Sequence, residues 1–173
     1  MPKPMIRIRQ VSDLDRCVHT LRAVHDADAY PLNWPSDPRC WLNPSRLIQA
    51  WIAEGPEGSV DGHVAVHRLA EGAPARQIEL SRLFVAPAAR RRSLARSLVD
   101  HARAWAADHQ HDLTLNVTDE SRSAAVAFYE ATGWRHSHTT DAGWTTPDGR
   151  PVRLRHYLLT TPPTDTGRPS AVP

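Results

Sequence analysis

The sequence is poor in cysteine, in lysine and in long apolar runs. Its two cysteines, Cys17 and Cys40, stand in no motif spacing, which excludes a disulfide-rich scaffold. Two free, buried thiols are expected, although the spacing alone leaves a single bridge open. No apolar run is long enough to span a bilayer, and residues 1–7 lack the hydrophobic segment of a signal peptide. We therefore expect a soluble, cytoplasmic protein without membrane contacts.

Net charge is equally small. The 21 lysines and arginines nearly balance the 19 aspartates and glutamates, so the formal charge is +2 and no global field favours nucleic acid. Lys3 is the only lysine. This arginine bias is typical of a GC-rich genome and weakens a functional interpretation of any single arginine.

What is present fits a globular protein, with 173 residues of which 40% are hydrophobic. We expect residues 1–160 to form a single domain and residues 161–173, rich in Pro and Thr, to form a disordered tail. Apolar periodicity predicts helices at 13–25 (with Ser12 as N-cap), 93–108 and 121–132, a short helix at 45–49, and strands at 5–9, 50–54, 59–68, 77–85, 112–117, 134–140 and 152–160. This order indicates an α+β fold with one sheet of mixed direction.

Residues 29–44 are expected to form an irregular loop. They contain four prolines, which excludes a regular helix through the segment. They also contain Tyr30, Trp34 and Trp41. A loop this aromatic is expected to pack against the domain, over a pocket.

The most informative segment runs from Leu83 to Leu98. A short apolar strand ends in a turn at Pro87, three arginines follow, and a helical pattern begins. A helix N-terminus exposes unpaired backbone N–H groups and carries partial positive charge, so a loop that leads into one is a natural phosphate site. Arginines add planar donors for phosphate oxygens. The segment therefore predicts binding of a phosphorylated small molecule.

Two motifs resemble those of the GNAT superfamily of N-acetyltransferases. The first is Arg90-Arg91-Arg92-Ser93-Leu94-Ala95, which resembles the family's signature for coenzyme A (CoA). The second, Ala125 to Trp134, is similar to the block "Ala-x-x-Phe/Leu-Tyr-Glu-x-x-Gly-Phe". The resemblance implies a GNAT fold, a mixed and mostly antiparallel sheet of six to seven strands, with helices on both faces and a splayed parallel strand pair at 77–85 and 112–117.

The first motif departs from the family pattern at one position, and so does the segment before the second. Ser93 stands where the family usually has glycine, and its Cβ crowds the closest approach of a ligand to the backbone. Arg122 stands where many members have asparagine, whose role would fall to Ser121 or Ser123.

The resemblance also implies acetyl-CoA as co-substrate. Backbone groups of the splayed strand would pair with pantetheine, and the helix start would hold the pyrophosphate. The residues implied in CoA binding are Leu83, Phe84, Val85, Arg90, Arg91, Arg92, Ser93, Leu94, Ala95, Arg96, Ser123 and Phe128.

Two residues are candidates for acid–base catalysis. Tyr129 matches the family tyrosine that protonates the leaving thiolate, and an ordinary tyrosine is protonated at neutral pH. Glu79, on the central strand, is the candidate base for the amine proton, with Ser81 on the same side to position a water. The alternatives are a purely structural Tyr129 in the core and a solvent-facing Glu79.

The acceptor pocket is expected at Tyr30, Asn33 and Trp34, and the partner is expected to be a small amine: an amino-acid-like metabolite, a polyamine or an antibiotic. A protein or peptide N-acetyltransferase and a non-catalytic CoA-binding sensor are the alternatives. Binding of nucleic acid is not expected, because no aromatic stacking set accompanies the arginines. No metal site is expected from pairs such as His136 and His138. Monomer and homodimer both stay open.

Overall fold

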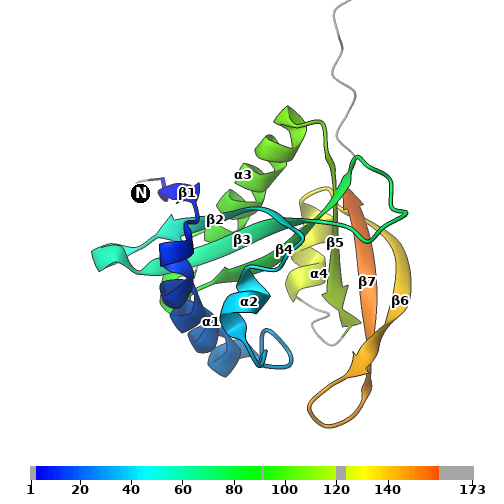
Figure 1. Cartoon of the computed structure of the whole chain (residues 1–173), viewed down its shortest axis with the longest axis horizontal. Helices are drawn as coiled ribbons and strands as arrows, with labels where there is room; N and C mark the ends of the chain where they lie inside the picture. The colour runs from blue at the N-terminus through cyan, green and yellow to red at the C-terminus, as the bar shows by residue number, and fades with distance from the viewer. Residues whose placement is uncertain (1–2, 91, 120–123, 160–173) are drawn as a thin grey trace, which may run out of the picture.

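A computed structural model describes residues 3–90, 92–119 and 124–159 (Figure 1). They form one seven-stranded sheet in the order β1-β2-β3-β4-β5-β7-β6. The strands are β1 Ile6–Ile8, β2 Leu47–Glu54, β3 Val60–Arg68, β4 Gln77–Val85, β5 Asp112–Thr118, β6 Arg135–Thr145 and β7 Pro151–Leu159. Strands β4 and β5 are parallel and the other neighbours are antiparallel, which confirms the predicted mixed α+β sheet.

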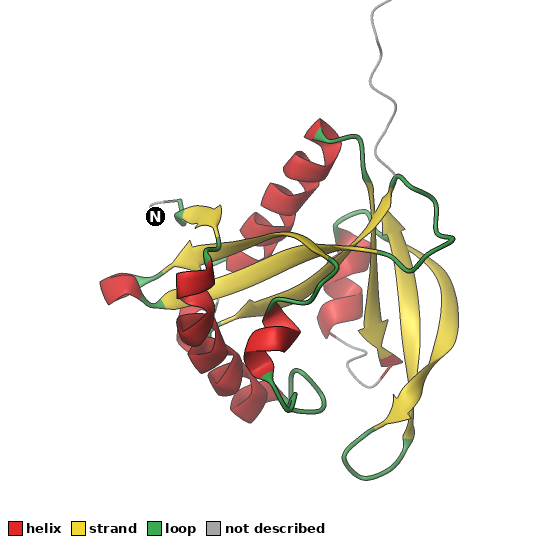
Figure 2. Cartoon of the chain, in the orientation of Figure 1, coloured by secondary structure: helices red, strands yellow, loops and turns green. Residues whose placement is uncertain are grey.

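Helices cover both faces of the sheet (Figure 2). They are α1 Leu14–Asp28, α2 Pro38–Leu42, α3 Leu94–Asp108 and α4 Ala124–Ala131, with 3-10 turns η1 Val11–Asp13, η2 Pro56–Gly58 and η3 Pro87–Ala89. Helices α1 and α2 contribute Leu21 and Leu42 to one buried cluster. Helices α3 and α4 contribute Leu98 and Tyr129 to the other. The sheet therefore separates two apolar cores.

Side chains of β4 alternate between these two cores. Ile78 and Leu80 are buried in the cluster that contains α3. Because successive side chains of a strand point to opposite faces, Glu79 and Ser81 face the side of α1 and α2. Phe84 is packed in the α1 cluster, because the pairing of β3 with β4 shifts register before it.

Three local predictions were wrong. The short helix expected at 45–49 is the beginning of β2, since Leu47 already pairs with β3. The loop at 29–44 contains α2, which starts with Pro38 directly after its N-cap Asp37. Proline is tolerated at this first position, because the N–H group there makes no hydrogen bond within the helix. The N-cap of α1 is Asp13 and not Ser12.

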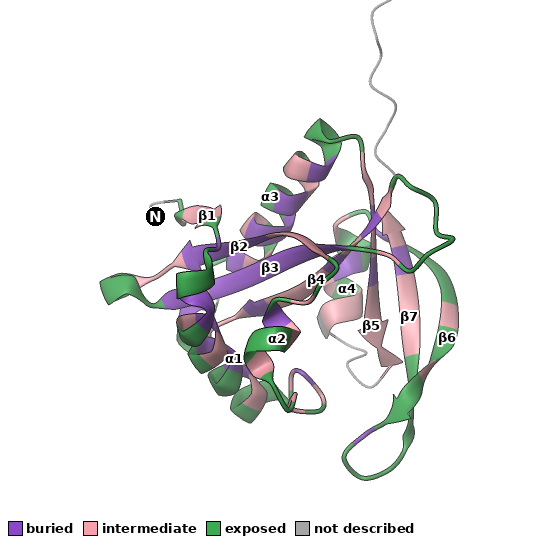
Figure 3. Ribbon diagram, viewed as in Figure 1, coloured by how far each residue is buried: buried purple, intermediate pink, exposed green. Residues whose placement is uncertain are grey.

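Burial falls from the centre of the sheet toward its outer strand (Figure 3). Strand β3 is buried along most of its length, whereas most residues of β6 are exposed. Of the two thiols, which are both free, Cys17 is buried as expected and Cys40 is exposed. Within the described residues no helix is long and apolar enough to cross a membrane. The tail expected at 161–173 lies outside the described residues.

Candidate active site

The parallel strands β4 and β5 pair at one end only. Their register joins Gln77 to Asp112, Ile78 to Leu113 and Glu79 to Thr114, and no further residues pair. After that point β4 stays paired with β3, and β5 stays paired with β7. Backbone groups of β4 that face β5 beyond Glu79 therefore have no strand partner among the described residues. This is the splayed pair that the resemblance implied.

The predicted pantetheine-binding residues lie in this open half of β4. Leu83 and Val85 are half-buried. Phe84 is 3% exposed and stacks on His63, with the ring centroids 5.0 Å apart. Because its ring is packed in the core, only the backbone groups of Phe84 are available to bind a ligand.

Helix α3 begins as an anion site would. Its first turn is closed by the Ser97 N–H, which donates to the Ser93 carbonyl at 3.0 Å. The N–H groups of Leu94, Ala95 and Arg96 precede that bond and so have no acceptor within the helix. The Leu94 side chain is buried and anchors the helix start, while Ser93, the N-cap, has a φ of 54° in the left-handed region.

The arginines beside this helix start already face carboxylates. Arg90 forms a two-pronged ion pair with Asp28 of α1. Arg92 and Arg96 lie farther from Asp61 and Asp100, at 3.9 and 4.0 Å. All three arginines are exposed, and exposed ion pairs are weak, so an incoming phosphate can displace them. Arg91 lies outside the described residues.

A cavity of about 500 Å³ lies beside the helix start, lined by Arg92, Ser93 and Leu94. Its remaining lining residues belong to the β2–β3 hairpin and to residues 3–5. None of them comes from β5 or α4, so this cavity is separate from the opening between β4 and β5.

Glu79 sits where β4 and β5 separate. The Asn116 side chain of β5 donates a hydrogen bond to Glu79 Oε2 at 3.3 Å and bridges the opening. Burial raises the pKa of the Glu79 carboxyl, which makes it a stronger base than an exposed carboxylate. Ser81, expected to position a water, hydrogen-bonds to Nδ1 of His67, a histidine whose Nε2 is buried without a partner in the described residues.

Tyr129 lies on α4, 7% exposed. Its ring contacts Phe128, which is half-buried, and Trp134, at centroid distances of 5.2 and 5.8 Å. Burial raises the pKa of the Tyr129 hydroxyl, so it keeps its proton at neutral pH. Ser123, the other residue predicted near this helix, lies outside the described residues.

Of the three predicted acceptor residues, Tyr30 lies closest to the catalytic candidates. Burial raises the pKa of its hydroxyl to about 12, and the charges of Arg82 and Glu79 act on it. The residue as a whole is half-buried, and its ring lies 6.2 Å from the Trp41 ring. Tyr30 also raises the pKa of Tyr129. The loop after α1 thus meets the side of β4 that carries Glu79.

The other two acceptor residues have different surroundings. Asn33 is exposed, and its amide donates to the Thr145 carbonyl at the end of β6, at 2.9 Å. Trp34 packs on α1, where its ring lies 5.3 Å from His25 and 3.9 Å from the Arg22 guanidinium carbon. Asn33 therefore connects the loop after α1 to the end of β6, while Trp34 packs against α1.

Sequence reasoning missed Asn116 and Arg82. The sequence does mark Asn116, as a polar residue between the apolar Leu115 and Val117 of a predicted strand. Arg82 follows Glu79 by three residues on the central strand, but its approach to the site depends on a left-handed φ of 54° that no local pattern marks.

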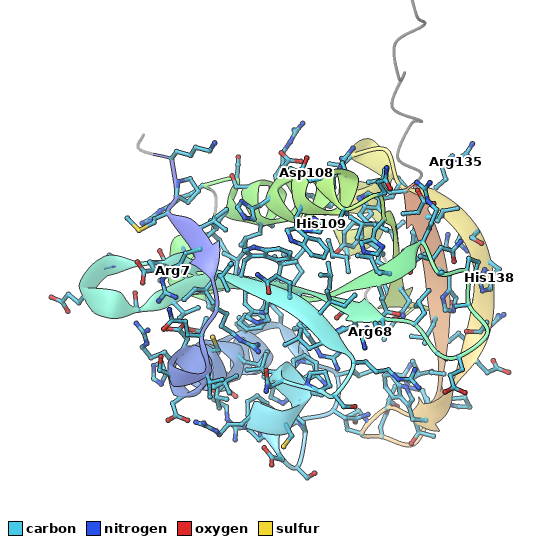
Figure 4. The ribbon with its side chains drawn as sticks, turned by 45° about the horizontal axis from the view of Figure 1, so that its top comes forward. Arg7, Arg68, Asp108, His109, Arg135 and His138 are labelled. Atoms are coloured by element: carbon cyan, nitrogen blue, oxygen red, sulfur yellow. The ribbon has the colours of Figure 1, made fainter. Side chains whose placement is uncertain are left out.

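His136 and His138 both lie on β6, whereas the second histidine pair, His109 and His111, follows the end of α3. His109 caps the end of α3 and His138 lies on the outer strand β6 (Figure 4). His109 stacks on Trp105 with the centroids 4.2 Å apart, and His138 stacks on His156 at 4.3 Å. Their rings are engaged in surface packing of these two elements.

Solved structures share this fold. The ribosomal-protein-S18-alanine N-acetyltransferase from Escherichia coli is 17% identical, with a TM-score of 0.71, over 96% of this chain and 100% of that chain. A ribosomal-protein-alanine N-acetyltransferase from Brucella melitensis is 24% identical, with a TM-score of 0.71, over 91% and 99%. Arabidopsis thaliana NAA60 in complex with acetyl-CoA is 16% identical, with a TM-score of 0.69, over 91% and 98%.

No curated protein matches the sequence. The model of the Acetyltransferase (GNAT) family does match, over residues 11–134. This match runs from the turn before α1 through both motifs and includes the splayed strands. The chain therefore belongs to the GNAT acetyltransferase family, whose members use acetyl-CoA, and is an acyltransferase of that family.

Proposed function

We propose that the protein transfers the acetyl group of acetyl-CoA to the primary amine of a small molecule, by direct attack while both substrates are bound. The observation that carries the proposal is the opening between β4 and β5, which begins at Glu79. Unpaired backbone groups follow on β4, and burial raises the pKa of both the Glu79 carboxyl and the Tyr129 hydroxyl.

Acetyl-CoA supplies the activated acetyl group as a thioester. In the proposed reaction the amine nitrogen forms a bond to the carbonyl carbon, and the bond from that carbon to sulfur breaks. Glu79, directly or through a water, accepts the proton that the amine loses. Tyr129 donates its hydroxyl proton to the departing thiolate. Backbone N–H groups near Leu83 polarise the carbonyl, and those of Leu94 to Arg96 hold the pyrophosphate.

A protein acceptor is the second candidate. Two of the similar structures are named for acetylating an alanine of a ribosomal protein. Their identity to this chain is below 25%, so they support the fold and leave the acceptor open. A CoA-binding sensor without catalysis is the third candidate, which the Ser93 departure keeps open.

The test combines thermal stability with turnover. We expect acetyl-CoA at 100 times its Kd to stabilise the protein by about 2.7 kcal/mol, and at least one small amine to be acetylated. Tyr129→Phe should lower kcat by about 10²-fold or more and leave the Kd for acetyl-CoA unchanged. Tyr157→Phe is the matched control, because Tyr157 is also buried but donates to Glu130.

Three results would contradict the proposal. Stabilisation without turnover of any amine would favour a sensor, and turnover of peptides alone would favour a protein acceptor. An active Tyr129→Phe variant would remove Tyr129 as the acid.

A further inference from the structure

Arg82 is held in an unusual conformation beside the site. It lies on the central strand β4 at the register shift between β3 and β4, with a φ of 54°. A left-handed backbone is unfavourable for a residue other than glycine. Such a conformation persists where the surrounding structure enforces it, often at functional sites.

The guanidinium of Arg82 is fixed from one side. Its central carbon lies 4.0 Å from the centroid of the Trp41 ring, and Nε donates to the Trp41 carbonyl at 3.2 Å. No hydrogen bond or ion pair with another described residue uses Nη1 or Nη2 of this side chain. Two parallel N–H donors are therefore left for a planar acceptor such as a carboxylate.

The neighbouring buried arginine, Arg9, has acceptors for both of its terminal nitrogens. Arg9 is buried on the same side of the sheet. Its Nη1 donates to the Leu42 carbonyl and its Nη2 donates to Asn43 Oδ1, both at 2.7 Å. Arg82 has Glu79 as its nearest carboxylate on the strand, yet no ion pair joins them. Burial lowers the pKa of Arg82, so its cation is poorly solvated and gains from an added anion.

The two opposite charges match one kind of molecule. Glu79 is the proposed acceptor of the amine proton, and Arg82 follows it by three residues. The charges of both side chains affect the pKa of Tyr30. An amino acid carries an ammonium and a carboxylate separated by a single carbon. Its amine can lie at Glu79 while its carboxylate lies on Arg82.

We propose that Arg82 binds the carboxylate of the acceptor, and that the acceptor is a free amino acid or a close analogue with both charges. This inference rests on the proposed small-amine acetyltransferase function. A polyamine lacks the carboxylate, and in a peptide N-terminus the carboxyl next to the amine is an uncharged amide. Both are therefore disfavoured beside Arg82.

The experiment compares L-amino acids with their carboxamides, which share the side chain and amine but lack the negative charge. We expect the wild-type enzyme to prefer the acid by about tenfold to a hundredfold in kcat/KM, the range for a hydrogen-bonded charge. Arg82→Met, which keeps an apolar stem over Trp41, should abolish this preference by raising KM for the acids far more than KM for the carboxamides. Arg82→Lys should retain part of it.

Arg46→Met, on an exposed arginine before β2, is the control and should keep the preference. Equal or better turnover of carboxamides by the wild type would overturn the inference and leave the small-amine function standing. An Arg82→Met variant that loses both substrates alike would also overturn it, since that is the signature of a structural role. Absence of turnover with every acid, carboxamide and amine would contradict both proposals.

Discussion

At the scale of single residues, burial gives the two acid–base candidates opposite tasks. Glu79 is half-buried at the point where β4 and β5 separate, and Asn116 holds its Oε2. Tyr129 is buried among aromatic rings. Burial raises the pKa of both groups. For the carboxyl this strengthens the base, and for the phenol it secures the proton that a leaving thiolate needs.

Glu79→Gln should lower kcat/KM by about 10²-fold or more, because the amide accepts no proton. In the wild type, activity should fall as pH drops through the raised pKa of Glu79, at a pH above the ordinary 4.5. Steady-state rates against pH measure both effects. Glu71→Gln, in an exposed loop, is the control and should leave the profile unchanged.

The same substitution should have the opposite effect on stability. A raised carboxyl pKa means that the folded state binds the proton more tightly than the unfolded state, so ionised Glu79 destabilises the fold at pH values above that pKa. Glu79→Gln should therefore raise the Tm at pH 7, with the gain disappearing near pH 3. A lower Tm at pH 7 would mean that Glu79 has a favourable partner and is not a desolvated base.

Ser93→Gly should stabilise the protein by about 1 kcal/mol, because its left-handed φ of 54° suits glycine. It should also lower the Kd for CoA, since the Cβ beside the helix start is removed. Denaturant unfolding and titration calorimetry measure the two effects. Gln110→Gly is the matched control: its φ is 58° at the other end of α3, so it should gain stability without changing CoA affinity.

At the scale of elements, two loops far apart in the sequence flank the site. The loop between α1 and α2 contributes Tyr30, and Asn33 binds the Thr145 carbonyl at the end of β6. This hydrogen bond holds the loop after α1 close to the end of β6. The proposed acceptor site thus draws on both halves of the chain.

Asn33→Ala should raise KM for the amine about fivefold, the equivalent of one hydrogen bond of about 1 kcal/mol. KM for acetyl-CoA should stay the same, because the proposed cofactor site lies on β4 and α3. Ser36→Ala, exposed in the same loop, should change neither constant. A rise in KM for acetyl-CoA alone would contradict the placement of the acceptor between these loops.

At the scale of the whole molecule, a buried polar network joins the sheet to the segments around it. His63 of β3 donates from Nδ1 to the Arg82 carbonyl at 2.8 Å, so its Nε2 accepts from Arg9 Nη1 at 3.0 Å. Arg9 also binds the end of α2 through Leu42 and Asn43. The network connects four segments and requires a neutral His63.

Acid should therefore weaken the fold well before carboxylates titrate. Burial lowers the pKa of His63 to about 3 and of His67 to about 4. The unfolded chain takes up these protons near pH 6.5, so the stability is fully present above that pH and is lost as pH falls below it. Each histidine should remove up to about 1.4 kcal/mol per pH unit. Urea unfolding between pH 7 and pH 4.5 measures the slope.

His63→Gln should reduce that slope, since one titrating group is gone. His19→Gln, on the exposed face of α1, should leave it unchanged. A wild-type stability that is flat from pH 7 to pH 4.5 would contradict the neutral, buried state of both histidines.

Much of the fold could be predicted from local pattern. The bounds of β4 follow from its apolar alternation, and α3 ends where its periodicity ends. The start of β2 was missed because Leu47 is a strand residue only through its pairing with β3. Helix α2 was missed because proline excludes a helix interior and permits a first turn.

The sequence by itself determined most of the helices and strands, the position of the helix start that is proposed to bind an anion, and the match of Tyr129 to the family motif, because each of these depends on neighbouring residues. Only the tertiary structure decided that Asn116 holds Glu79, that Arg82 rests on Trp41 with two donors free, and that Arg90 is paired with Asp28. The physical reason is that these contacts join residues more than 35 positions apart. Their geometry depends on strand register and on one left-handed residue, which periodicity does not encode.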